Sequence, residues 1–242
     1  MSDYPHLENA PIREALFDIQ VNPRSDLEIN ELKQFHDSIS ADYPKEQIQK
    51  QFHISFSLGQ TRKTAQTEEP MGFRYESEDG KQVVQARRDG YTFSRLEKYE
   101  TWANLREEAV RLWKLYKEIA QPELIKRVAV RYINSFKIEA PFEKYLQAPP
   151  IILPGLSVSL QGFLTRAVVH DDTSNANVII TQGVKEIEDD GSVPLILDID
   201  VYKVVSLEPD DELIWSTIES FHDVKNNIFF NSITKEAVEM FK

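Results

Sequence analysis

WANLREEAVRLWKLYKEIAQPELIKRVAVRYINSFKI, from Trp102 to Ile138, predicts a long amphipathic helix, a short turn and a strand. Up to Ile119, apolar side chains recur every three or four residues and charged side chains occupy the other side, as in a helix packed on a core. Thr101 is placed to cap this helix, because its hydroxyl can accept a hydrogen bond from a free amide of the first turn. From Arg127 onward, a period of two with apolar residues on both faces predicts a central strand.

The composition of the 242-residue chain is typical of a globular protein with a substantial core, because 41% of its residues are hydrophobic and 28% are charged. No apolar run approaches the roughly 20 residues of a membrane helix, and the first residues lack the layout of a secretory signal. We therefore expect a cytoplasmic protein. Cysteine is absent, which excludes disulfides, thiolate metal sites and cysteine nucleophiles.

The net charge of -12 is concentrated in one stretch of the chain. The stretch from Asp171 to Glu212 contains twelve acidic residues and two basic ones, Lys185 and Lys203, so its net charge is -10. Since phosphate neutralisation dominates nucleic-acid affinity, an acidic chain without a long basic run is a poor candidate for general nucleic-acid binding.

Before Trp102, the pattern predicts a strand that ends before Pro23, a helix, a strand at residues 51–58 and a meander. Ser25 and Glu28 have the spacing of a capping box, which starts the helix here. The polar residues 60–70 indicate a mobile loop, and the two Asp-Gly pairs at residues 79–80 and 89–90 indicate tight hairpin turns.

After Ile138, the pattern predicts a short helix, three strands and a last helix. The expected elements are a helix at 142–146, strands at 156–169, 178–185 and 195–205, and a helix at 211–229. Asp210 or Asp211 caps the last helix, and its stripe contains Ile214, Ile218, Phe221, Lys225 and Ile228.

Both halves therefore have the order strand, helix, antiparallel meander, long helix. This order predicts an α+β protein of two similar units, residues 1–122 and 123–242, each a curved antiparallel sheet with a long helix packed on one face. Residues 102–119 and 211–229 are expected to be the two longest helices. A single continuous sheet with four helices gives the same order of elements and remains open.

Several short motifs resemble a sporadically distributed prokaryotic family of uncharacterised proteins of about 250 residues. The motifs are Asn9-Ala10-Pro11-Ile12-Arg13-Glu14-Ala15, Leu112-Trp113, the RVAVRYIN segment at 127–134, Phe221-His222, Ile228-Phe229 and Ser232-Ile233-Thr234. The resemblance implies a prokaryotic or phage protein and brings no activity, cofactor or catalytic residue.

Metal and nucleotide chemistry have little support in the sequence. No two of the five histidines, His6, His36, His53, His170 and His222, have the spacing of metal ligands on one face. Asp198 and Asp200 share a strand face that can hold a hard cation, but an ion pair with an arginine such as Arg131 explains them more simply. Serine-hydrolase, phosphate-loop and dinucleotide motifs are absent from the sequence. We expect no metal ion and no cofactor.

The candidate ligand-binding residues are Arg87, Arg95 and Arg131. Arg87 and Arg95 lie near Tyr91 and Phe93, a combination that can stack on and pair with a nucleotide, although a solvated strand face explains it as well. Arg131 lies in the central strand, where a guanidinium pairs with a buried acid or takes an anion. We expect Arg131 to be largely buried and paired.

The leading hypothesis is a non-enzymatic binding or regulatory module that takes a protein partner, or a small ligand between sheet and helix. The alternative is an RNA-processing or nucleotide-handling enzyme that uses His53, Arg95 and Arg131 in one cleft. An acidic surface expected at one end of the second sheet favours an unknown basic partner, although turn formation and solubility explain the same residues. Its residues are Asp171, Asp172, Glu188, Asp189 and Asp190. The sequence leaves open whether the chain forms a homodimer.

Overall fold

The computed structural model describes residues 4–57, 63–97, 99–139, 141–151, 160, 162–184 and 192–242. These residues contain one antiparallel sheet of nine strands, in the order β2-β3-β4-β5-β1-β6-β9-β8-β7. Its strands are β1 (Ile12–Asn22), β2 (Lys45–Ser57), β3 (Lys63–Glu76), β4 (Gln82–Arg87), β5 (Gly90–Leu96), β6 (Leu124–Ile138), β7 (Phe163–Asp171), β8 (Ala176–Val184) and β9 (Val193–Leu207).

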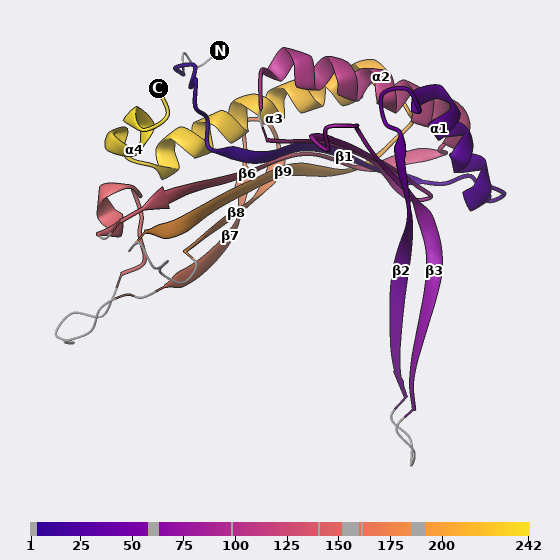
Figure 1. Cartoon of the computed structure of the whole chain (residues 1–242), viewed down its shortest axis with the longest axis horizontal. Helices are drawn as coiled ribbons and strands as arrows, with labels where there is room; N and C mark the ends of the chain where they lie inside the picture. The colour runs from indigo at the N-terminus through magenta and orange to yellow at the C-terminus, as the bar shows by residue number, and fades with distance from the viewer. Residues whose placement is uncertain are drawn as a thin grey trace.

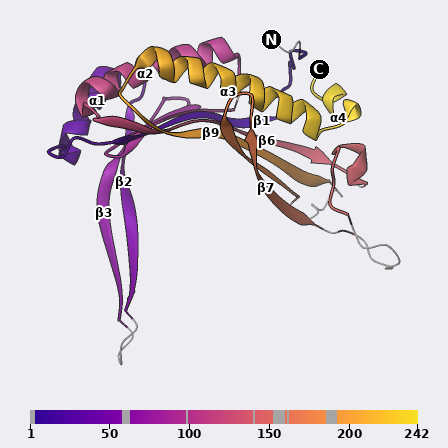
Figure 2. The ribbon, with the colours of Figure 1, turned by 180° about the vertical axis from the view of Figure 1, so that it is seen from behind.

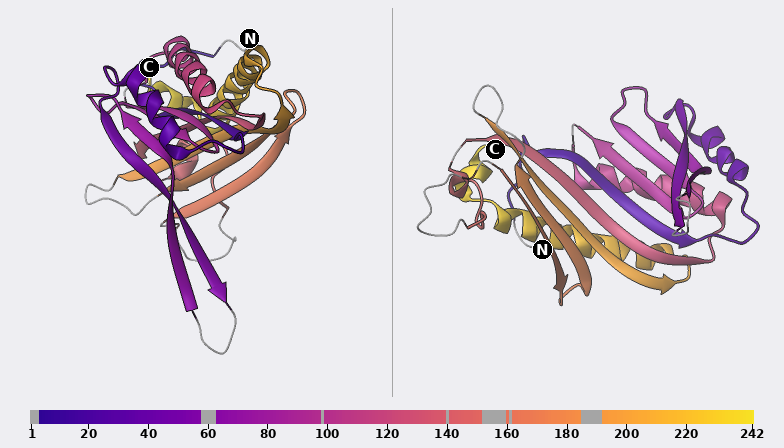
Figure 3. Two further views of the ribbon diagram at one scale, coloured as in Figure 1. Left: turned by 90° about the vertical axis from the view of Figure 1, so that its right-hand side faces the viewer. Right: turned by 90° about the horizontal axis from the view of Figure 1, so that it is seen from below.

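The helices labelled α1 to α4 lie along one side of this sheet (Figures 1 and 2). The described helices are η1 (Ile29–Lys33), α1 (Gln34–Ile39), α2 (Trp102–Ala120), η2 (Phe142–Lys144), α3 (Asp211–Ser232) and α4 (Lys235–Glu239). We call the side of the sheet under α2 and α3 the helix face. The opposite side, which the view from below in Figure 3 shows, is the open face.

Alternating side chains on the central strands build the core on the helix face. On β1, Ala15, Phe17 and Ile19 are fully buried, whereas the residues between them point to the open face and are only partly covered. α2 and α3 run antiparallel across this apolar layer, because Trp102 at the start of α2 contacts α3 at His222 and Lys117 near its end pairs with Asp211. The core therefore lies between a single sheet and two long helices.

The predicted α+β arrangement of two similar units, each with its own sheet and long helix, is wrong. β1 of the first half pairs with β6 of the second half over ten residues, so the strands of both halves form one continuous sheet. Both long helices lie on the same face of that sheet. The apolar pattern of each strand predicted its buried face but not its neighbours, because strand pairing joins residues far apart in the chain.

Several local predictions are confirmed. The two longest described helices are α2 and α3, and β6 is a central strand between β1 and β9. The hydroxyl of Thr101 accepts a hydrogen bond from the amide of Asn104, and Asp210 caps α3 through the amides of its first turn. Each capping side chain fixes the start of a helix that covers the sheet.

Two predictions before α2 are wrong. Residues 63–70 of the predicted loop belong to β3, which pairs with β2 in a hairpin that projects away from the sheet (Figure 1). The sequence pattern missed them because their mostly polar side chains lack the alternation of a half-buried strand. The capping box lies three residues later than expected, where the amide of Glu28 donates to the carboxylate of Glu31 and opens η1.

In the described part of the chain, none of the helices has the length and apolar character needed to cross a membrane.

Candidate functional site

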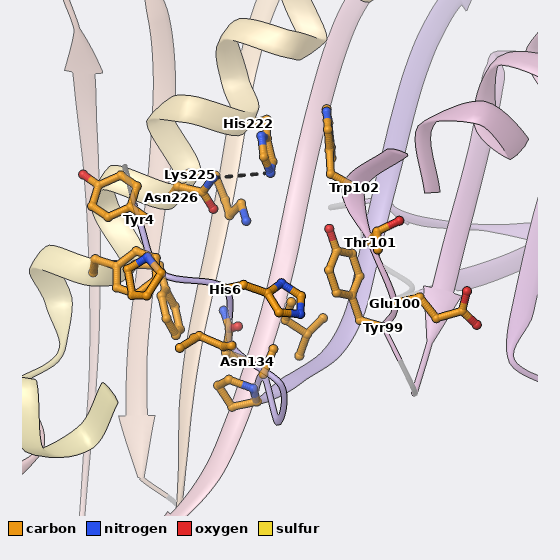
Figure 4. A pocket seen from close by; sticks show the side chains of 17 residues that line it. Tyr4, His6, Tyr99, Glu100, Thr101, Trp102, Asn134, His222, Lys225 and Asn226 are labelled. Carbon is orange, nitrogen blue, oxygen red and sulfur yellow. Dashed lines mark hydrogen bonds between the residues drawn. The ribbon is translucent and has the colours of Figure 1, made fainter. Parts of the chain in front are cut away.

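A cavity of about 280 Å³ lies on the helix face, between α3, β6, residues 99–102 and the N-terminal residues 4–12 (Figure 4). Its apolar walls include Leu7, Pro11, Ile12, Phe229 and Phe230. Its polar side chains include Tyr4, Tyr99, Asn134, His222, Lys225 and Asn226. This combination of apolar walls with a few polar groups is typical of a small-molecule site, and the volume lies just below the usual range of about 300 to 1,000 Å³.

Lys225 places an amino group on the wall of this cavity (Figure 4). The residue occupies a position in the apolar stripe of α3, between Phe221 and Phe229, and only 7% of its surface is exposed. Its Nζ lies 3.8 Å from the centre of the Tyr132 ring on β6, a cation–π contact. No described residue forms an ion pair or hydrogen bond with this amino group. Burial lowers the pKa of Lys225 to about 7.

His222, one helical turn before Lys225, forms part of the same wall. Its ring stacks on the indole of Trp102, with ring centres 4.0 Å apart. Burial, helped by the charge of Lys225, lowers the pKa of His222 to about 3, so the ring is neutral at neutral pH. The neutral ring accepts a hydrogen bond at Nε2 from the Nδ2 of Asn226, 3.3 Å away.

Asn134 and Tyr99 supply two further polar groups from the sheet side. Asn134 on β6 is almost fully buried, and its Nδ2 donates to the carbonyl oxygen of Leu197 at 3.0 Å. The hydroxyl of Tyr132 donates to that of Tyr99 at 3.3 Å. Burial raises the pKa of Tyr99 to about 12, so this phenol stays protonated and keeps its own hydrogen to donate.

The N-terminal segment covers one side of the cavity and is attached to the C-terminal helices. Tyr4 stacks on Phe230 with ring centres 4.6 Å apart, and its hydroxyl donates to Asn227 at 2.9 Å. The amide of Asn9 donates to the carbonyl oxygen of Phe241. These contacts explain how two ends of the chain, distant in sequence, enclose one cavity (Figures 1 and 4).

Glu100 is the one carboxylate among the described residues that line this cavity, and its oxygens have other partners. Its Oε1 accepts a hydrogen bond from Arg95 at 2.9 Å, and its Oε2 accepts one from Asn104 at 3.1 Å. The Glu100 side chain is also largely exposed to solvent. It therefore does not neutralise Lys225.

The three predicted ligand-binding arginines do not converge. Arg95 lies opposite Ala15 and therefore faces the helices, whereas Arg131 lies opposite Leu16 and belongs to the open face. Arg87, also on the open face, pairs with Asp18 at 3.1 Å. The alternative enzyme hypothesis requires His53, Arg95 and Arg131 to meet in one cleft. Arg95 and Arg131 lie on opposite faces of the sheet, and the side chain of His53 lies outside the described residues.

Arg131 is paired, as predicted, but it is not largely buried. Its Nε and Nη2 donate to the two oxygens of Asp198 at 2.8 and 2.6 Å, a bidentate ion pair. The expectation of burial is wrong, because 42% of the side chain is exposed. Among the described residues, no helix covers the open face of the sheet, so a guanidinium in a central strand still reaches solvent there.

The predicted acidic surface stays a prediction, because three of its five residues lie outside the described part of the chain. Asp171 is the last residue of β7, and its carboxylate accepts hydrogen bonds from the amide and hydroxyl of Ser174 in the following turn. Asp198 lies on the open face of β9, whereas Asp211 at the start of α3 pairs with Lys117. Asp172 follows Asp171 in the exposed turn. Glu188, Asp189 and Asp190 lie outside the described residues.

No family model matches the chain. A comparison with curated proteins finds no match either. The resemblance to a prokaryotic family therefore stays a prediction. Among the described residues, no group of three or more His, Asp or Glu side chains is arranged to hold a metal ion. The case for the candidate site therefore comes from its geometry alone. Its central residue, Lys225, is marked in the sequence as a charged residue within an apolar helical stripe.

Proposed function

We propose that this chain is a non-enzymatic binding protein that takes a small molecule in the cavity between the sheet, α3 and the N-terminal segment. The observation that carries this proposal is the largely buried side chain of Lys225, which lines the cavity and whose amino group has no hydrogen-bonding partner among the described residues. Buried polar groups in folded proteins are almost always satisfied, so an amino group left open on a cavity wall indicates a partner that arrives from outside.

The surroundings of Lys225 favour binding over catalysis. His222 stacks on Trp102 and is held neutral, and the described carboxylate at the rim, Glu100, is engaged by Arg95 and Asn104. Neither group is positioned as a general acid or base next to the amino group. The site offers one charged contact, a few hydrogen-bonding groups and apolar walls, which suffice to hold and orient a small molecule.

A nuclear magnetic resonance titration with four probes of one size tests this proposal. The probes share a phenyl ring, and they are an anion (benzoate), a cation (benzylamine) and two uncharged molecules (benzamide and benzyl alcohol). We expect at least one of them, at millimolar concentration, to shift the indole signal of Trp102, which lines the cavity. The indole signal of Trp113, whose Nε1 donates to Asp211 away from the cavity, serves as the internal reference.

A matched pair of variants shows whether the probes enter this cavity. Ala10 lines the cavity and Ala103 lies exposed on α2, so Ala10→Phe should abolish the Trp102 response while Ala103→Phe retains it. If none of the four probes shifts the Trp102 signal, or if Ala10→Phe leaves the response unchanged, the proposal is wrong.

The cytoplasmic location and a basic protein partner, both expected from the sequence, remain predictions.

A further inference from the structure

We infer that the ligand of this cavity is a small organic anion with an apolar body, whose negatively charged group pairs with the amino group of Lys225. This inference rests on the proposed function and adds the chemical class of the ligand.

Lys225 carries an ammonium group that lacks a countercharge among the described residues. A buried ammonium group is costly unless an opposite charge or several hydrogen bonds replace its hydration. In this protein the face of the Tyr132 ring, 3.8 Å from Nζ, is the described group that stabilises the ammonium. An anion in the cavity supplies the opposite charge that the described residues do not.

Other titratable and charged groups also face the amino group of Lys225. They come from every packed element: His222 on α3, Tyr132 on β6, Tyr99 and Glu100 before α2, and Tyr4 and His6 in the N-terminal segment. Burial holds His222 neutral and keeps the two central phenols, Tyr99 and Tyr132, protonated. Glu100 pairs with Arg95, and His6 is exposed. No described group on this list provides the countercharge.

The lining and volume of the cavity indicate the shape of the ligand. The phenol of Tyr99 and the ammonium of Lys225 are donors, which suits the oxygens of a carboxylate. Phe229, Phe230 and Leu7 line the remaining walls, so the rest of the ligand is apolar. A cavity of about 280 Å³ admits a carboxylate with a small hydrocarbon or aromatic body and excludes large polyanions.

Anion binding should be coupled to protonation of Lys225. An anion favours the ammonium form and raises the pKa of Lys225 from about 7. The apparent affinity should therefore be highest below pH 7 and fall as the amino group loses its proton. Between pH 6 and pH 9, a requirement for the ammonium predicts a loss of about a hundredfold in affinity.

The test compares benzoate with its uncharged analogue benzamide by calorimetry at pH 6 and pH 9. We expect benzoate to bind at least about tenfold more tightly than benzamide at pH 6. This preference should disappear in Lys225→Met. In the control Lys235→Met, which removes an exposed lysine at the start of α4, the preference should persist. Lys225→Arg should retain the preference and lose its dependence on pH, because a guanidinium stays protonated at pH 9.

The outcomes separate the two proposals. If benzamide or benzylamine binds as tightly as benzoate, or if Lys225→Met retains the preference, the cavity binds small molecules but the anion inference is overturned. If no probe binds to the wild-type protein, both proposals fail. An unchanged Trp113 indole signal shows that Lys225→Met is folded, so a loss of benzoate binding then supports the inference.

Discussion

On the open face of the sheet, Arg87, Arg127 and Arg131 each pair with an aspartate, whereas on the helix face Lys225 is buried without an acidic neighbour among the described residues. Asp18 alone accepts hydrogen bonds from Arg87 at 3.1 Å, from Arg127 at 2.9 Å and from the hydroxyl of Thr92 at 2.8 Å. These open-face arginines thus have carboxylate partners, whereas Lys225 of α3, packed on the helix face, has none among the described residues.

This difference separates a structural role from a binding role. The charges of the open face satisfy one another, so they hold neighbouring strands in register and leave little to offer a ligand. Arg127 illustrates this, because it bridges Asp18 on β1 and Asp200 on β9 across its own strand β6. The ammonium of Lys225 has no carboxylate neighbour among the described residues, and it borders a cavity. The following variants should sharpen or break this contrast.

The largest effect is expected for Lys225→Met, as a change in how stability depends on pH. In the unfolded chain Lys225 has a pKa of about 10.5, against about 7 in the folded protein. Between these values the unfolded chain binds the extra proton, so the wild type gains stability as pH rises, by about 1.4 kcal/mol per pH unit. Lys225→Met lacks the titrating group, so its stability should not rise with pH in this way. At pH 7 the variant should be more stable than the wild type by about 4 kcal/mol, and this difference should shrink toward pH 10.

Urea unfolding at pH 7, 8.5 and 10 measures this difference. Lys235→Met, which removes an exposed lysine, is the control and should parallel the wild type at every pH. Parallel curves for Lys225→Met as well would mean that the amino group titrates normally, and the contrast between the two faces would be lost.

A smaller effect, about 3 kcal/mol of destabilisation, is expected for Asp18→Ala. The Asp18 side chain is only 14% exposed, and its removal leaves Arg87 and Arg127 without a shared partner. Glu97→Ala is the matched control, since it removes the partner of Arg13 from a surface pair in which the Glu97 side chain is 59% exposed. The control should cost less than about 1 kcal/mol in thermal or urea unfolding. Equal losses for the two variants would show that the open-face pairs are not structural.

The smallest effect is expected for Arg131→Ala, at about 1 kcal/mol. The bidentate pair with Asp198 is lost, but solvent reaches the exposed part of this site and screens the remaining carboxylate. Urea unfolding of the variant measures the cost. A loss of about 4 kcal/mol would indicate that Arg131 behaves as a buried group, and the open face would not be open at this position.

Local elements were predictable because their signals lie within a few residues of one another. Thr101 caps α2, and the two-residue period of β6 marks a strand with two covered or partly covered faces. The single sheet was not predictable, since the pairing of β1 with β6 joins residues more than a hundred positions apart. Each of these strands carries the same kind of apolar alternation, which does not specify a partner.

The sequence marks one residue of the candidate site but not the residues around it. Lys225 stands out as a charge within the apolar stripe of α3, and that signal is local. Its meaning depends on Tyr132 and Asn134, which β6 brings beneath α3, and on the N-terminal segment, which lines one side of the cavity. The arginines of β4–β6 are conspicuous in the sequence, yet the open-face ones pair with aspartates on other strands of the sheet.

The most direct test is the pKa of the Lys225 amino group. A carbon-13 titration of lysine side chains, with the Lys225 signal assigned by its absence in Lys225→Met, follows this group between pH 5 and pH 11. We predict a midpoint near 7, because the amino group is buried without an acidic partner, and an upward shift of that midpoint when benzoate is present. A midpoint near the ordinary value of 10.5 would contradict the central claim that the helix face holds an uncompensated charge.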